Sequence, residues 1–492
     1  MATEIELKLA LPASAARTLA GHPLLAGVVP SRHRLLNTYY DTPDLALKAR
    51  RIALRFRKKG WQWLLTVKSA EPASGGLALR SEWEVAATPG TWTFAHIDQP
   101  ALREFLEDAA PRLEPVFTTH FQRTAWTLSY GDSLVELALD RGRIESASRH
   151  TPICEVELEL LSGAIGDLFA LAKALQASLP LRPSAASKAE RGYAQFLDEP
   201  PRPCKARLQP LDPDATPSQA FRQIALACLE QLQRNEAGVI QGTDPEFVHQ
   251  ARVALRRLRS AIKVFAPALP ADFATAWSQA WQTLAAALGE ARNWDVLVNE
   301  TLPPLQAAFP DHRPLARLAA AAHRQSREAH AMVARLLRMA EYPRLLTEFT
   351  ASLYALPNDG NDQPLPDFAI DQLTRRARQA KRLARQHAAL TAEERHRMRL
   401  AFKKLRYTLE FFASLLPRRR LGAYLAALAQ LQDELGLIND HATAAELVEK
   451  VLGERYQGPI LGWIAGRHAL LVEELPESLD TWLAQRNPWK RR

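Results

Sequence analysis

The chain has few of the features that would assign it to a secreted, membrane-spanning or P-loop class. Its 492 residues include three cysteines, which are scattered and show no ligand spacing, so neither a disulfide framework nor a zinc site is expected. The N-terminus lacks a basic segment followed by an apolar one, and no apolar run is long enough to span a bilayer. A GxxxxGK[ST] loop is also missing. We therefore expect a cytoplasmic protein with no membrane segment.

Positive charge is concentrated in the second part of the chain. Residues 1–200 carry 23 basic and 23 acidic residues, whereas the remainder carries 40 basic and 31 acidic residues. The net charge of +9 therefore lies entirely after residue 200 and predicts a polyanionic partner for that part. The length and the hydrophobic fraction of 47% predict two or three globular domains.

Charged and apolar residues alternate in the first part, beginning with Glu4, Glu6 and Lys8 on one face of a strand. Same-face residues lie roughly 6.6 Å apart, so two carboxylates can converge on one divalent cation. Similar stretches follow up to residue 161, and a helix is expected over 100–110. Each stretch alone fits a half-exposed strand. Together, basic residues in some strands and paired acids in others favour a barrel whose charged interior binds phosphate and metal.

Several spaced motifs resemble those of the CYTH domains, the triphosphate tunnel metalloenzymes, across residues 2–196. They are Glu4-x-Glu6-x-Lys8, Tyr39-Tyr40-Asp41-Thr42, Leu54-Arg55-Phe56-Arg57, Thr66-Val67-Lys68, Arg80-Ser81-Glu82 and Glu155-Val156-Glu157. The resemblance implies an eight-stranded antiparallel tunnel over residues 1–197 that hydrolyses tripolyphosphate to phosphate and pyrophosphate with Mg²⁺ or Mn²⁺. Thiamine or nucleoside triphosphate hydrolysis and ATP cyclisation stay open as alternatives. A non-catalytic polyphosphate-binding or nucleic-acid-binding protein is a further one.

The same resemblance implies a role for each matching residue. Glu4 and Glu6 would bind a metal, and Asp140, Glu155 and Glu157 would hold a second metal or its water. The groups expected to neutralise phosphoryl oxygens are Lys8, Arg55, Arg57, Lys68, Arg80 and Arg123, with Lys188 on a closing helix and Arg34 as a weaker match. Glu82, Glu84, Glu136 and Glu159 would equally serve to orient the arginines.

A proline-rich stretch, residues 198–217, marks the expected domain boundary, and the pattern after it is helical. Residues 249–259 match residues 396–406 at an offset of 147 residues, which indicates a duplicated helical unit. This part resembles the CHAD domain over about residues 215–490. The resemblance implies an all-α bundle of two four-helix halves, over residues 218–490, that binds inorganic polyphosphate. The whole chain is then an α+β protein of two domains.

Basic residues form ridges at helical spacing in this part, two of them beside apolar stripes, and we expect them to bind the polymer. The candidates are Arg252, Arg256, Arg259, Lys263, Arg375, Arg378, Arg382, Arg399, Lys403 and Arg406, with His249 and His396 at the positions of the family's histidines. Buried structural histidines are an equal alternative. No aromatic series lies between the basic residues, which argues against single-stranded nucleic acid. The expected location is the cytoplasm, in association with polyphosphate granules, and no oligomeric state is predicted.

Overall fold

In the computed structural model the chain forms two compact units. The first comprises Met1–Arg202 together with Met339–Ala355, and the second comprises Pro203–Arg338 together with Leu356–Arg492. The structure describes residues 2–70, 75–147, 149–242, 244–357, 363–386 and 391–489. None of the described helices is long and apolar enough to cross a membrane. The expected helical domain, residues 218–490, thus includes a segment that belongs with the first unit.

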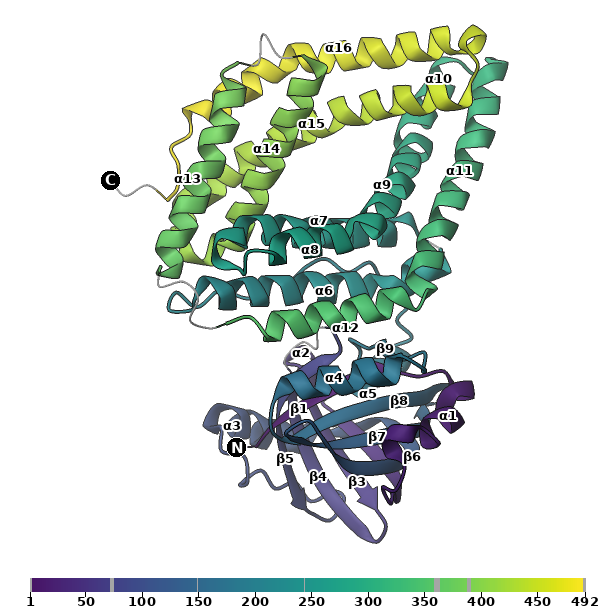
Figure 1. Cartoon of the computed structure of the whole chain (residues 1–492), viewed down its shortest axis with the longest axis vertical. Helices are drawn as coiled ribbons and strands as arrows, with labels where there is room; N and C mark the ends of the chain where they lie inside the picture. The colour runs from purple at the N-terminus through teal and green to yellow at the C-terminus, as the bar shows by residue number, and fades with distance from the viewer. Residues whose placement is uncertain are drawn as a thin grey trace. The chain divides into compact units, whose positions relative to one another are not determined.

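Eight strands of the first unit form a closed antiparallel barrel, as predicted (Figure 1). They are β1 (Ala2–Ala10), β2 (Ser31–Asp41), β3 (Ile52–Lys59), β4 (Gln62–Ala70), β5 (Leu77–Ala86), β6 (Glu114–Tyr130), β7 (Ser133–Ser146) and β8 (Arg149–Ser162). The strand order is β5-β4-β3-β2-β6-β7-β8-β1, and the pairing of β1 with β5 closes the barrel. A two-residue strand β9 (Arg182–Pro183) adds to β1, and α3 (Pro100–Ala109) confirms the predicted helix.

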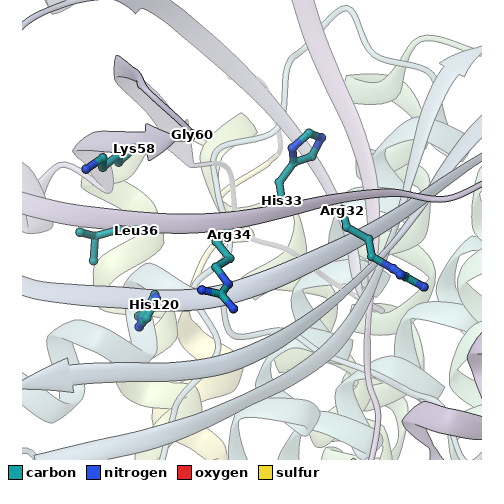
Figure 2. Close-up of a pocket in the computed structure, with 7 residues that line it drawn as sticks. All are labelled: Arg32, His33, Arg34, Leu36, Lys58, Gly60 and His120. Carbon is teal, nitrogen blue, oxygen red and sulfur yellow. The ribbon is translucent and has the colours of Figure 1, made fainter.

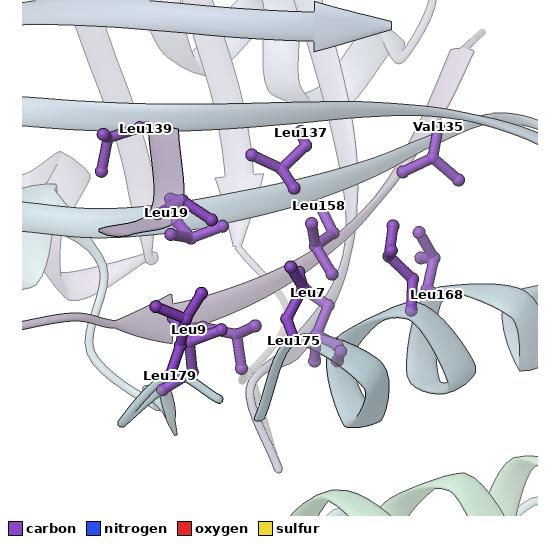
Figure 3. Close-up of a cluster of buried hydrophobic side chains, with 14 of the residues drawn as sticks. Leu7, Leu9, Leu19, Val135, Leu137, Leu139, Leu158, Leu168, Leu175 and Leu179 are labelled. Carbon is purple, nitrogen blue, oxygen red and sulfur yellow. The ribbon is translucent and has the colours of Figure 1, made fainter. Parts of the chain in front are cut away.

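Apolar residues of the barrel strands point outward and pack beneath helices. Leu7 and Leu9 on β1 are fully buried in a cluster with residues of α1 (Ala16–Ala20) and α4 (Ile165–Gln176), as Figure 3 shows. Phe56 and Val67 join a second cluster, which includes Leu106 of α3. Because successive side chains of a strand point to opposite faces, the charged residues that alternate with these apolar ones face the interior.

Helix α5 (Lys188–Phe196) covers one end of the barrel interior. The Ser187 hydroxyl caps it by accepting from the backbone N–H of Glu190. The Tyr193 hydroxyl donates to Asp41 at 2.8 Å, and its ring lies 5.2 Å from that of Phe117. A Cβ on Gly192 would lie 2.1 Å from the Phe117 ring, so the close approach of α5 requires glycine.

Helix α12 (Glu341–Tyr354) also packs within the first unit, although it is encoded far from the barrel strands. Arg344 donates to the carbonyl of Gln176 at 3.0 Å, and the Tyr354 ring stacks on Phe169 with 6.0 Å between centroids. Both Gln176 and Phe169 belong to α4. Helix α12 is therefore part of the layer that covers the outside of the barrel.

The second unit is all-helical, as predicted, and its helices repeat along the chain. Helix α7 begins at Pro245 and α14 begins at Ala392, 147 residues later. The first set is α6 (Pro217–Gln241), α7 (Pro245–Phe265), α9 (Gln282–Val296) and α11 (Arg313–Arg338), with the short α8 (Phe273–Ala280) and α10 (Leu302–Ala308). The second set is α13 (Leu365–Ala384), α14 (Ala392–Phe411), α15 (Arg418–Val451) and α16 (Glu454–Ala484).

Candidate functional site

The strand register places charged residues of neighbouring strands side by side in the barrel. The facing pairs are Glu4 with Arg80, Lys8 with Glu157, Lys68 with Glu82, Arg123 with Asp140, and Asp140 with Glu155. Several strands thereby contribute charge to one interior. The predicted barrel residues, from Glu4 on β1 to Glu157 on β8, are therefore brought together.

Carboxylates outnumber cations at the side of the interior formed by β1. Glu6 is 3% exposed, and its Oε1 atom has no hydrogen-bond partner among the described residues. Burial, followed by the charge of Glu157, raises the pKa of Glu6 to about 7. Burial and the charge of Glu4 likewise raise the pKa of Glu159 to about 7. Oxygen donors with excess negative charge suit a divalent cation, so the chemistry of these acids is compatible with the metal predicted for Glu4 and Glu6, which stays a prediction.

Lys68 holds Glu4 in place. Its Nζ atom lies 2.7 Å from Glu4 Oε2 and 2.7 Å from Glu82 Oε2. One ammonium therefore bridges two carboxylates from different strands, and Lys68 and Glu82 position a predicted metal ligand in addition to any contact with substrate.

The acids on the neighbouring strands β7 and β8 are neutralised by cations of the protein itself. Asp140, Glu155 and Glu157 each bring one carboxylate oxygen within 4.8 Å of the others. Lys188 Nζ lies among them, 2.6 Å from Asp140, 2.5 Å from Glu155 and 2.8 Å from Glu157. Arg123 also binds Asp140 and Glu157. The three acids have the donor atoms of a metal site, but a cation there would compete with Lys188.

Two arginines of β3 are oriented by neutral side chains that the charge pattern of the sequence does not single out. Arg57 Nε donates to Asn37 Oδ1 at 3.0 Å, and Arg55 donates to the Tyr39 hydroxyl at 3.1 Å. Burial and the charges of Arg55 and Arg123 lower the pKa of Arg57 to about 10. Asn37 and Tyr39 alternate along β2 with residues that point outward. In the sequence, this alternation is the feature that could have placed their side chains inside the barrel. The crowded guanidinium groups favour an anion between them.

Two further arginines have different environments. Arg80 is 8% exposed, and its Nε atom has no hydrogen-bond partner in the described part of the chain. Arg34, in contrast, is exposed. The prediction that Arg34 shares the interior was wrong, because the buried residues of β2 are Leu35, Asn37 and Tyr39, and Arg34 therefore points outward.

Cations from both sets of helices meet in the second unit. We call Arg252 and Arg256 of α7 and Arg399 and Lys403 of α14 the cation cluster. Burial, followed by the arginines of the cluster, lowers the pKa of Lys403 to about 6. Burial and neighbouring arginines also lower the pKa of Arg252 to about 10. Asp440 is a neighbouring acid, and half-buried cations that depress one another's pKa in this way favour an anionic ligand.

The other residues predicted to bind the polymer differ in their surroundings. His249 is half-buried, and burial followed by the charge of Arg292 lowers its pKa. Arg406 is bound to Glu410 at 2.8 Å and to Gln432 at 3.1 Å. Arg259 is half-buried, and the exposed or half-exposed residues are Lys263, Arg375, Arg378, Arg382 and His396. The ridge on α13 is therefore a surface feature, unlike the cation cluster.

Comparison with known families identifies both units. The family model of the CYTH domain matches residues 2–193, and that of the CHAD domain matches residues 223–449. The chain is a CYTH domain followed by a CHAD domain. The CYTH match includes every predicted barrel residue from Glu4 to Lys188, and the CHAD match includes the whole cation cluster.

Individual relatives match either domain. An inorganic triphosphatase of Haemophilus influenzae is 34% identical over 204 residues, which are 40% of this chain and 58% of that protein. The match thus spans less than two thirds of the relative. The CHAD domain of the plant Ricinus communis is 32% identical, covering 58% of this chain and 98% of that chain, with a TM-score of 0.49. A putative adenylyl cyclase of Hippeastrum, with a dominant triphosphatase activity, is 20% identical over 39% of this chain and 96% of that chain, with a TM-score of 0.31.

Proposed function

We propose that the CYTH domain is a metal-dependent inorganic triphosphatase that hydrolyses tripolyphosphate to phosphate and pyrophosphate, and that the CHAD domain binds long-chain polyphosphate. One observation carries the first part: within one closed barrel, Arg55 and Arg80 have buried N–H groups without hydrogen-bond partners among the described residues, and the buried Oε1 of Glu6 has only a long ion pair of 3.6 Å with Lys8. The interior therefore offers unused donors to an anion and an unused acceptor to a cation. The similarity to an inorganic triphosphatase supports this reaction.

The cations of the barrel would bind and orient the substrate. Phosphoryl transfer depends on in-line geometry and on neutralising charge, with little covalent chemistry left for the protein. Arg55, Arg57 and Arg80 offer N–H donors to phosphoryl oxygens, and the contacts of Arg57 with Asn37 and Glu84 fix its direction. Lys8, Lys68 and Arg123 add positive charge, and Lys188 holds the carboxylates of β7 and β8 in place.

Glu4 and Glu6 would hold Mg²⁺ or Mn²⁺, with Glu159 as an additional acid close by. A divalent cation bound there supplies further neutralisation of phosphoryl oxygens and lowers the pKa of water. The raised pKa of Glu6 favours this assignment, because a carboxylate forced to share a buried site with Glu157 loses its proton readily once a cation arrives.

Phosphate release from a panel of triphosphates tests the reaction. We expect the highest kcat/KM for tripolyphosphate, one pyrophosphate released per phosphate, and no activity in EDTA or in the Glu6→Gln variant. A higher kcat/KM for thiamine triphosphate or ATP would show that this compound is the substrate, and the reaction proposed for the barrel would stand. If none of the triphosphates releases phosphate, the barrel is not a triphosphatase and the protein only binds its ligands.

The cation cluster carries the second part of the proposal. Arg256 Nε and Arg399 Nε are buried without hydrogen-bond partners among the described residues, and they come from two different helices. A flexible chain of phosphates supplies several anionic oxygens at such a place without bringing bulky bases. Filter binding of long-chain polyphosphate, in competition with duplex DNA and RNA at equal phosphate concentration, tests the ligand. Displacement of polyphosphate by nucleic acid would make the domain a general polyanion binder.

A further inference from the structure

A second basic site lies at the start of β2, outside the barrel interior. It is a pocket of about 380 Å³ (Figure 2). The side chains that matter for its chemistry are Arg32, His33, Arg34, Leu36, Lys58 and His120. Three strands, β2, β3 and β6, contribute them. All but Leu36 are basic or titratable, so the pocket differs in composition from an ordinary apolar cavity.

The register stacks positive charge across the outer face of these strands. Lys58 pairs with Leu36, which pairs with His120, which in turn pairs with Arg143. In the neighbouring row Arg34 is joined to Arg141 through Gln122. Like charges that are directly opposed on one face of a sheet destabilise it, and here an uncharged residue separates the cations in each row except at His120 and Arg143. A face with this concentration of basic residues favours an anion that spans several strands.

The cations of this pocket are not neutralised by the protein. Within the described residues neither Arg32 nor Arg34 nor Lys58 forms an ion pair with a carboxylate, whereas Arg143 is bound to Glu145. Arg32, Arg34 and Lys58 are exposed, so a ligand can reach their heads from solvent, and the Lys58 ammonium lies 5.7 Å from the centre of the Trp63 ring. The chemistry that this arrangement recognises is a chain of phosphates or another extended polyanion.

One residue of the pocket also faces the interior of the barrel. His33 pairs with Arg123 and lies in phase with the buried Leu35 and Asn37. The opposite end of β2 is the end covered by α5, where Asp41 binds Tyr193. A phosphate chain that leaves the interior past His33, at the end of β2 away from Asp41, therefore reaches the rim of the barrel and continues onto Arg32 and Arg34.

We propose that this pocket, the rim site, binds the phosphates of a long polyphosphate chain that extend beyond those held inside the barrel. The inference rests on the proposed triphosphatase and deepens it: the CYTH domain itself recognises chains longer than tripolyphosphate. Nucleic acid is the less suitable ligand, because the described lining of the pocket contains no aromatic ring of Phe, Tyr or Trp on which bases stack. Trp61, on the neighbouring hairpin, is 99% exposed, and an exposed ring can stack on a base. The experiment therefore also includes nucleic acid.

Chemical labelling of Lys58 in the full-length protein tests the rim site without relying on turnover. Acetylation by an amine-reactive reagent is followed by mass spectrometry with no addition, with tripolyphosphate, with polyphosphate of about 15 phosphates or with single-stranded DNA at equal phosphate. We expect at least threefold slower labelling of Lys58 with the long chain alone, and unchanged labelling of Lys173, an exposed lysine on α4. Equal labelling of Lys58 in all four samples would overturn the proposal. Stronger protection of Lys58 by DNA would show that the rim site binds nucleic acid instead of polyphosphate.

Kinetics of charge-reversal variants provide the second measurement. In protein that also carries Arg252→Glu and Arg399→Glu, the polymer acts as a competitor of tripolyphosphate hydrolysis at the barrel. We expect Arg34→Glu and Lys58→Glu each to raise the Ki of long-chain polyphosphate at least five times more than the KM of tripolyphosphate. The matched reversals Arg17→Glu and Arg202→Glu, at exposed positions away from the pocket, should change neither. Equal changes in Ki and KM would refute the rim site. Absence of tripolyphosphate hydrolysis would refute only the triphosphatase, since the labelling of Lys58 needs no turnover.

Discussion

The neutral side chain of Asn37 fixes the orientation of the charged Arg57 side chain. It is fully buried, accepts from Arg57 Nε at 3.0 Å and donates to Thr119 at 2.9 Å. Asn37→Ala keeps every charge in the barrel but frees the Arg57 head. We expect kcat/KM for tripolyphosphate to fall about tenfold, which corresponds to about 1.4 kcal/mol. Arg57→Ala should lower it at least as far, and Arg112→Ala, at an exposed ion pair with Asp44, should not change it. A lower melting temperature with unaltered kinetics would make Asn37 purely structural.

Lys403 gives polymer binding a pH dependence of known sign. Its pKa of about 6 leaves it largely neutral at pH 8 in the free protein, and a bound polyanion raises that pKa. Binding therefore takes up a proton, and affinity should fall as pH rises from about 6 towards the pKa of the bound state. Calorimetry between pH 7 and 9, in buffers of different ionisation enthalpy, measures the uptake. Lys403→Arg should reduce the uptake in this range. Unchanged uptake in that variant would assign the proton to another group.

The positions of individual residues in the barrel could be predicted from the sequence only in part. Alternation predicted the charged face of β1 because Leu7 and Leu9 are apolar at every other position. The same reasoning misplaced Arg34, since β2 carries polar residues on both faces and its phase is fixed only by burial of Asn37 and Tyr39. The position of Lys188 among three carboxylates depends on α5 reaching β7 and β8 together, which no local pattern contains.

Among the elements, α12 has a role that its position in the chain does not suggest. Its residues 341–354 lie between the two repeated sets of helices, yet they pack on α4 of the barrel unit. Ala351 and Tyr354 join the apolar cluster of Leu7 and Leu9. Periodicity predicts a helix there but not the unit against which it packs. Such long-range docking depends on surface complementarity formed only after both parts fold.

The CYTH domain should accordingly need α12 for full stability. A polypeptide of residues 1–202 lacks this helix, and a fusion joins residues 339–357 to the same polypeptide through a Gly/Ser linker. We expect the fusion to melt several degrees higher, since about 1 kcal/mol shifts the melting temperature of a domain of this size by roughly 2–4 °C. The same fusion with Arg344→Glu and Tyr354→Asp should lose the gain. Identical melting of the shorter polypeptide and the unmutated fusion would show that α12 contributes nothing to the barrel.

For the whole molecule we expect catalysis and long-polymer binding to respond to different substitutions. Arg252→Glu combined with Arg399→Glu should weaken long-chain polyphosphate binding at least 100-fold, because it places two anions among the remaining cations of the cluster. Its kcat/KM for tripolyphosphate should match that of the control pair Arg467→Glu and Arg486→Glu, at exposed positions. Affinity should also fall steeply with salt. A parallel loss of hydrolysis would mean that the two domains act as one site.

The repeat that builds the CHAD domain has a consequence for the direction of its ligand. Arg252 and Arg256 occupy the positions in α7 that Arg399 and Lys403 occupy in α14, so each half of the repeat contributes a matched pair of cations to the cluster. A polymer whose two directions are chemically equivalent can meet these matched pairs in either order. Linear polyphosphate reads identically from both ends, whereas a nucleic acid strand has a 5′ and a 3′ end. We therefore expect an encounter of polyphosphate with the cluster to be productive whichever end arrives first.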